Sequence, residues 1–155
     1  MKGEKLLDYL VKNNVKFEII HHPVAFSSTK TAQVAHVHGR EMAKPVIVKI
    51  GNKLVMVVMT ANQKVNLSLL KALYQTDDVE LASETDFIRR FGDCEMGAMP
   101  PFGNLYGMDE LVSDDLTKDE AIVFNAGTHT ELIRMKYRDF ENLVHPRIVN
   151  FKISL

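Results

Sequence analysis

A lysine at the head of an apolar strand is the first residue whose type and position could do chemistry. Lys44 directly precedes the run Pro45–Ile50, and a second apolar run, Lys53–Met59, follows the dipeptide Gly51-Asn52. Two β-rich runs around a glycine-first dipeptide predict a hairpin closed by a type II′ turn. Pro45 biases Lys44 towards an extended backbone, so its ammonium group would be presented from a stiff strand end.

The register of this hairpin decides where the Lys44 side chain points. It sets Ile50 opposite Lys53 and Lys44 opposite Met59, and alternate residues of a strand share a face. Lys44 then lies on the more apolar face, which we expect to point inward, together with Val46, Val48 and Ile50. An ammonium group at the rim of that face could steer an anionic or carbonyl-bearing substrate. A lysine at a sheet edge that reaches back into water fits the same pattern.

Two glycine-bearing loops are the other candidates. Gly97–Gly103 reads Gly-Ala-Met-Pro-Pro-Phe-Gly; its glycines allow close backbone approach and its prolines hold the chain rigid. It could form a pocket wall that hydrogen-bonds through its backbone, or a stiff connector that buries Phe102. In Phe124–His129, Asn125 and Gly127 suit a turn with positive φ. His129 could donate a hydrogen bond or carry a proton near neutral pH, or be an ordinary turn histidine.

Composition limits the classes of protein to which these residues can belong. The chain has 155 residues, which predicts one domain, residues 1–155. A formal net charge of −1 argues against a protein that holds nucleic acid by bulk charge. Cys94 is the only cysteine, so no internal disulfide can form, and a polar N-terminus with no long apolar run favours a cytoplasmic protein.

The elements that must position these residues are short and mixed. Strands without regular βαβ alternation favour a mixed sheet or an open barrel. Ser27-Ser28 predicts the start of a short helix that Gly39 would end. Further helices are expected at Gly3–Asn13, Asn66–Tyr74, Ser83–Phe91 and Tyr137–Leu143, and further strands at Val15–Ile20, Val79–Leu81, Leu105–Leu111, Ala121–Phe124 and Glu131–Met135.

The order of these motifs resembles the signature of the YbaK and prolyl-tRNA-synthetase insertion family. Lys44 before a strand is followed by the GxxPPFG segment and by the NAGTH turn, while His21–Pro23 matches an HHP-like turn. The stretch Ser28–Lys49 matches a helix leading to a K-x-x-x-x-K pattern. Across nearly the whole chain, the resemblance implies a mixed α/β fold with a barrel-like central sheet flanked by helices. It also implies hydrolysis of mischarged aminoacyl-tRNA, in trans or as an inserted editing domain.

The resemblance further implies a site. Lys44, Gly97 and His129 are its expected catalytic residues; Lys44 would bind the terminal adenosine phosphate or stabilise developing charge, while loop backbone groups orient the ester and water. Pro45 stands where many relatives have Thr or Asn, which leaves the amino acid removed undetermined. Substrate contacts are expected from Phe26, Ser28, Met42, Met99, Pro100, Pro101, Phe102, Gly103, Asn125, Ala126, Gly127 and Thr128. Of these, Phe26, Met42, Met99 and Phe102 would line the side-chain pocket or else pack in the core.

The expected partners are the 3′ end of a mischarged tRNA and a synthetase such as prolyl-tRNA synthetase. The main alternative is a non-catalytic module that binds aminoacyl-tRNA or a synthetase without hydrolysis. No cofactor or metal is expected, because neither His21-His22 nor His36 with His38 has the geometry of a ligand pair. A dedicated RNA-binding domain is disfavoured by the absence of a basic stripe, and a nucleophilic role for Cys94 is disfavoured as well.

Overall fold

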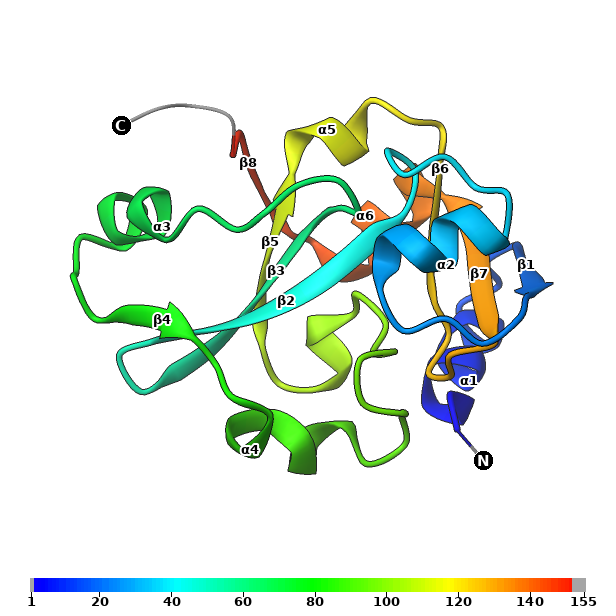
Figure 1. Cartoon of the computed structure of the whole chain (residues 1–155), viewed down its shortest axis with the longest axis horizontal. Coiled ribbons are helices and arrows are strands. Elements are labelled where there is room, and N and C mark those ends of the chain that lie inside the picture. The colour runs from blue at the N-terminus through cyan, green and yellow to red at the C-terminus, as the bar shows by residue number, and fades with distance from the viewer. Residues whose placement is uncertain (1, 152–155) are drawn as a thin grey trace.

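The computed structural model of the protein describes residues 2–151 and consists of two β-sheets with helices packed around them (Figure 1). The strands are β1 (Phe17–His21), β2 (Ala43–Ile50), β3 (Lys53–Thr60), β4 (Val79–Leu81), β5 (Asp109–Ser113), β6 (Ala121–Asn125), β7 (Glu131–Lys136) and β8 (Arg147–Val149). The α-helices are α1 (Glu4–Lys12), α2 (Ser28–Val34), α3 (Leu67–Tyr74), α4 (Glu84–Phe87), α5 (Asp114–Thr117) and α6 (Tyr137–Val144), and 3-10 turns span Ile88–Phe91 and Gly103–Leu105.

The sheets differ in size and direction. The smaller has three antiparallel strands in the order β1-β7-β6, and the larger has five strands in the order β4-β2-β3-β5-β8, with parallel pairs at β3–β5 and β5–β8. The mixed α/β class is therefore confirmed, and within residues 2–151 the strands divide into two sheets where one barrel-like sheet was expected. An isolated parallel bridge between Met42 and Val123 joins the two sheets, and among the described residues the edge strands β4 and β8 do not pair with each other, so no barrel closes.

The central hairpin follows the predicted register. Ile50 pairs with Lys53 and Lys44 pairs with Met59, and Gly51 has a φ of 62°, as a type II′ turn requires. The expectation that one face of this strand points inward is incomplete, because apolar residues cover both faces of β2. Lys44 shares its side with residues that pack on one apolar cluster, while Ala43 and Ile47 belong to another. Almost every residue of β3 is buried, so this sheet is a central layer.

Three element boundaries differ from the sequence prediction. The helix capped by Ser27 ends at Val34, not at Gly39, because His36 takes a left-handed φ of 57°. The strand expected from Leu105 begins at Asp109, since Gly103–Leu105 forms a 3-10 turn first. The expected helix Ser83–Phe91 divides into α4 and a 3-10 turn. Helix α5 and strand β8 are too short to show periodicity and had no sequence signal.

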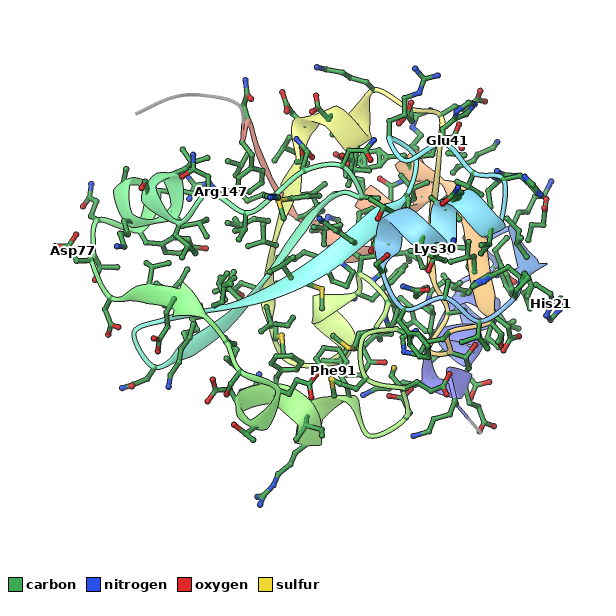
Figure 2. The ribbon with its side chains drawn as sticks, viewed as in Figure 1. His21, Lys30, Glu41, Asp77, Phe91 and Arg147 are labelled. Carbon is green, nitrogen blue, oxygen red and sulfur yellow. The ribbon has the colours of Figure 1, made fainter. Side chains whose placement is uncertain are left out.

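The remaining predicted elements are present within one or two residues of their expected ends. The interior between the two sheets is filled by apolar side chains, with Phe91 among them, while His21 and Asp77 lie at opposite ends of the molecule (Figure 2). Phe102 is fully buried there, with its ring 5.5 Å from that of Phe124 and 5.3 Å from that of Phe140. This packing fixes the Gly97–Gly103 loop against the small sheet.

Close backbone contact joins the start of α1 to the turn after β6. The Gly3 N–H donates to the Asp93 carbonyl at 2.8 Å. A Cβ added to Gly127, whose φ is 96°, would lie 2.7 Å from the Gly3 Cα, closer than real Cβ atoms come to backbone. Glycine is required at both positions because neither the dihedral angle nor the space admits a side chain.

A buried carboxyl group holds the far end of the Gly97–Gly103 loop. Oε1 of Glu110 accepts a hydrogen bond from the Gly103 N–H at 2.7 Å, and Oε2 has no partner among the described residues. Burial raises the pKa of Glu110 well above its ordinary value, and the Gly103 N–H opposes that rise only in part. Glu110 therefore keeps its proton at pH values where an exposed glutamate has lost it.

None of the helices within residues 2–151 is both long and apolar enough to cross a bilayer.

We expect Gly127→Ala to lower the free energy of unfolding by about 1–3 kcal/mol, the usual range for a side chain forced into a left-handed backbone. Urea denaturation measures it. The matched control is Gly92→Ala, where φ is −59° and nothing lies within 4 Å of the added Cβ. Equal urea midpoints for the two variants would show that a side chain at Gly127 does not lower the free energy of unfolding.

We expect Glu110→Gln to change how stability depends on pH. Above the ordinary glutamate pKa of about 4.3 the unfolded chain releases the Glu110 proton while the folded chain retains it, so the native protein loses up to about 1.4 kcal/mol of stability per pH unit until the raised folded pKa is passed. The variant lacks this loss, so the difference between its unfolding free energy and that of the native protein shifts in favour of the variant as pH rises. Urea denaturation from pH 5 to pH 8, with the exposed Glu120→Gln as control, measures the difference; parallel profiles would contradict it.

Candidate active site

Lys44 stands at a cavity and not in bulk solvent. Its side chain is half-buried, and Nζ donates a hydrogen bond to the Ala61 carbonyl oxygen at 3.3 Å. The cavity has a volume of about 400 Å³ and is lined by Ser27, Ser28, Thr29, Lys44, Ala61, Asn62, Gln63 and Lys64. The strand pairing explains this wall, since Lys44 lies opposite Met59 and the chain that leaves β3 at Thr60 turns back beside it.

Two lysine side chains, Lys44 and Lys64, line the cavity. Burial lowers the pKa of Lys44 from its ordinary value, and the positive charge of Lys64 lowers it further. Lys64 is exposed, so its charge is well solvated. The cost of losing hydration therefore falls mainly on the charge of Lys44. An anionic group bound between the two amines would relieve their repulsion and part of the desolvation. Lys64 was not among the residues predicted from the sequence. The pattern that could have identified it is a second lysine shortly after the strand that pairs with the strand of Lys44.

The junction of the sheets brings Lys44 and Asn125 to one side of the molecule. The bridge pairs Met42 with Val123, and Lys44 and Asn125 each stand two positions further along, on the same face as the paired residues. Helix α2 covers this face, where Ala32 and other apolar residues pack on Met42 and Val123. Asn125 is buried, and its Oδ1 has no hydrogen-bond partner within residues 2–151.

The two predicted loops form one unit. The Glu95 N–H donates to the Gly127 carbonyl at 2.8 Å, and the Gly127 N–H donates to the Ala98 carbonyl at 3.0 Å. The His129 N–H donates to Oε1 of Glu95 at 2.8 Å. Gly97 has a φ of 87° and faces the imidazole, because an added Cβ would lie 3.3 Å from Cε1 of His129. The structure thus brings Gly97 and His129 together.

The His129 ring is held on both sides. Nε2 lies 2.8 Å from the Met96 carbonyl oxygen and Nδ1 lies 3.2 Å from the Ala25 carbonyl oxygen. The Phe26 ring packs on the imidazole with a centroid separation of 4.7 Å and an interplanar angle of 57°. Because the residues after Phe26 line the Lys44 cavity, this segment connects the two loops to the lysine.

Core packing occupies three of the four positions of the expected side-chain pocket, because Met42, Met99 and Phe102 all belong to the buried apolar clusters. Met42 and Phe102 are fully buried, whereas Phe26 is 75% exposed and therefore lies on the surface. Met99 is buried and its Sδ accepts from the Gly97 N–H at 3.3 Å. Pro100, Pro101, Gly103, Ala126 and Gly127 are also buried, while Ser28 and Thr128 are half-buried. The loop side chains thus pack inward.

Cys94 is buried, and its Sγ lies 3.5 Å from the Tyr106 hydroxyl oxygen. Burial raises the pKa of the Cys94 thiol to about 11, although the hydrogen bond with Tyr106 opposes this. A thiolate is the nucleophilic form of cysteine, so Cys94 is poorly suited to attack a substrate near neutral pH. Among the described residues, no group of three or more His, Cys, Asp or Glu side chains could hold a metal ion.

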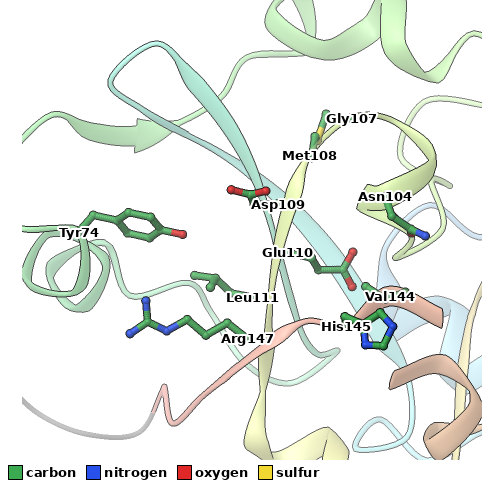
Figure 3. A pocket seen from close by; sticks show the side chains of 10 residues that line it. All are labelled: Tyr74, Asn104, Gly107, Met108, Asp109, Glu110, Leu111, Val144, His145 and Arg147. Carbon is green, nitrogen blue, oxygen red and sulfur yellow. The ribbon is translucent and has the colours of Figure 1, made fainter. Parts of the chain in front are cut away.

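A larger cavity of about 640 Å³ lies at the opposite end of the hairpin, where β8 begins beside β5 (Figure 3). Tyr74 and Arg147 lie on one side of it, and Glu110 points towards Asn104, Val144 and His145. None of the site residues that were predicted from the sequence lines this cavity. Volume alone therefore does not select the Lys44 cavity, because this cavity and another of about 750 Å³ beside Lys5 are both larger.

Comparisons with known proteins agree on one family. The model of the aminoacyl-tRNA editing domain matches residues 22–143, which include Lys44 and both loops. The multifunctional Ser/Thr-tRNA deacylase ProXp-y of Escherichia coli K12 is 25% identical, with 96% of this chain and 92% of that protein covered.

Solved structures share the fold. One described as a candidate trans-editing enzyme for prolyl-tRNA synthetase has a TM-score of 0.83 at 14% identity, covering 98% of this chain and 97% of the other. A protein described as hypothetical has a TM-score of 0.82 at 16% identity, covering 94% and 97%. With a family model that spans most of its length and both loops, the chain belongs to the aminoacyl-tRNA editing domain family.

Proposed function

We propose that this protein is a deacylase that acts in trans on mischarged aminoacyl-tRNA, with Lys44 as the central residue of its site. The observation that carries the proposal is the half-buried Lys44 ammonium group at a cavity that also holds Lys64. Membership of the editing domain family supports the class of reaction. The cytoplasm, where charged tRNA is used, is the compartment that this function requires.

The reaction asks little of a nucleophilic side chain. Water adds to the ester carbonyl carbon, the bond to the ribose oxygen breaks, and the products are a free amino acid and a tRNA with its hydroxyl restored. A proton of the attacking water ends on the departing ribose oxygen, relayed by solvent or by the neighbouring ribose hydroxyl. Because an aminoacyl ester is already reactive, holding it in place and stabilising the developing negative charge account for the catalysis.

Lys44 could act at either of two negative charges. It could neutralise the phosphate of the terminal nucleotide, or it could stabilise the oxyanion that forms on the ester carbonyl. The pair formed with Lys64 favours a bound anion, since burial and the charge of Lys64 both lower the pKa of Lys44, and an anion between the amines would offset both effects. Backbone groups of the joined loops would orient the ester next to Gly97. Both ring nitrogens of His129 face carbonyl oxygens, so in this proposal the ring fixes the loop.

Serine and threonine are the first amino acids to test. The similar protein from Escherichia coli is named a Ser/Thr-tRNA deacylase. The Lys44 cavity is small and its wall carries hydroxyl and amide groups from Ser28, Thr29 and Asn62, which can hydrogen-bond a short polar side chain. A synthetase partner, such as prolyl-tRNA synthetase, would supply tRNA affinity that a net charge of −1 does not.

We expect Lys44→Ala to lower kcat/KM for seryl- or threonyl-tRNA by about 10²-fold, the usual effect of losing one charge-stabilising group. Release of radiolabelled amino acid from a panel of mischarged tRNAs measures it. Lys49→Ala is the matched control, because Lys49 is a half-buried lysine of the same strand that points to the other face and lies 4.0 Å from Asp86. Full activity in Lys44→Ala would refute the site. No release of any amino acid by the native protein would favour the binding module.

We expect Lys64→Gln to separate the two roles of Lys44. If the amines bind a phosphate together, the variant raises KM several-fold, leaves kcat nearly unchanged and flattens the dependence of log KM on log salt concentration, because one ion contact is lost. The exposed Lys30→Gln serves as control. A fall in kcat at unchanged KM would instead assign the pair to the oxyanion.

A further inference from the structure

We propose that the exposed face of Phe26 is a stacking platform for the terminal adenine of the tRNA. This inference rests on the proposed function and extends it to the nucleotide that carries the ester. It concerns the segment Ala25–Thr29, which connects the His129 loop to the Lys44 cavity. The sequence suggested Phe26 as part of the amino-acid pocket, but its position on the surface calls for a different role.

The first step of the argument is the exposure of Phe26. With 75% of the residue accessible it is the most exposed large apolar residue among those described, and Val24 beside it is 59% exposed. Single apolar residues on a surface are common. What distinguishes Phe26 is that one part of its ring packs on the His129 imidazole at 4.7 Å while the rest remains free. A flat apolar face is therefore presented to solvent at a defined orientation.

The second step is the rigidity of the support. Both imidazole nitrogens of His129 face backbone carbonyl oxygens, one from Ala25 and one from Met96. The Ala25 N–H also donates to the His129 carbonyl at 3.3 Å. The residue before Phe26 is thus tied to the histidine that the Phe26 ring contacts. A pre-positioned ring loses less conformational entropy on binding than a mobile one, which makes it an effective contact.

The third step is distance along the substrate. Ser27, the next residue after Phe26, lines the cavity that Lys44 and Lys64 share, and consecutive Cα atoms are about 3.8 Å apart. In an aminoacyl-tRNA the ester and the terminal base are attached to the same ribose. If the ester is held at the Lys44 cavity, an adenine one sugar away can reach Phe26, which directly precedes the cavity residue Ser27.

The fourth step is chemistry. Every nucleobase has a flat π-face, and stacking on an aromatic side chain is a common way for proteins to hold single-stranded ends of nucleic acid. The CCA end of tRNA is unpaired, so its last base is free to stack. Such a contact would also distinguish tRNA-linked esters from other small esters. It adds affinity without added positive charge, which suits a chain with a net charge of −1.

The test compares Phe26→Leu, which keeps apolar bulk, with Phe26→Tyr, which keeps a flat ring. With seryl-tRNA as substrate we expect Phe26→Leu to raise KM about tenfold, within the range measured for loss of one base–aromatic stack, and Phe26→Tyr to stay near the native value. Val24→Ala, an exposed apolar neighbour outside the His129 contact, is the control and should leave KM unchanged. An unaltered KM in Phe26→Leu would overturn the platform while leaving the deacylase proposal intact.

A second measurement does not depend on catalysis. Uncharged tRNA with 2-aminopurine in place of the terminal adenine should lose fluorescence when the native protein binds, because stacking quenches this base, and Phe26→Leu should restore the signal at saturating protein. Quenching by the native protein that Phe26→Leu abolishes would support the platform even if no amino acid were released. Equal quenching by both proteins, or none by either, would overturn it.

Discussion

Backbone pairing between the Glu95–Ala98 segment and the turn around Gly127 is the interaction on which the candidate site depends. Two hydrogen bonds join these segments directly, and a third runs from the His129 N–H to the Glu95 side chain. Neither segment belongs to a sheet there, so without this pairing each would be an independent loop. Gly3 presses on the same turn from the start of α1. Three parts of the chain that are distant in sequence therefore hold one surface in place.

The second constraint is electrostatic. An ammonium group that is only half-exposed gives up part of its hydration, and Lys44 does so beside another cation. Such an arrangement is unfavourable for the free protein and becomes favourable when an anion arrives. The opposite case is Glu110, a buried carboxyl whose pKa is raised by burial and whose Oε1 accepts a hydrogen bond at the end of the glycine-proline loop. One group is held ready for a substrate, whereas the other holds the framework.

The site contains groups that can position the ester and polarise its carbonyl, and its one thiol, that of Cys94, is poorly ionised near neutral pH. Burial makes Cys94 a poor nucleophile, and the His129 ring is engaged by two carbonyl oxygens. This inventory suits an ester substrate that brings its own reactivity and its own neighbouring hydroxyl. The larger cavity near Tyr74 and Arg147 is a less suitable candidate because none of the site residues predicted from the sequence lines it.

The sequence by itself determined the local features that short-range rules control. The Gly51 turn, the pairing of Lys44 with Met59, and most helix and strand positions follow from hydrophobic period, turn residues and caps, and all were confirmed. The family also followed from the order of the motifs. Short elements such as α5 and β8 left no period to detect, and the end of α2 depended on the left-handed conformation of His36.

Only the tertiary structure decided which distant residues meet. It separated Phe26, on the surface, from Phe102, in the core, although both are phenylalanines next to a candidate motif. It joined the two loops, placed Lys64 at the Lys44 cavity, and divided the strands between two sheets where one barrel-like sheet was expected. The physical reason is that these outcomes depend on contacts between segments far apart in the chain, whose packing and desolvation are properties of the whole fold and leave no local pattern.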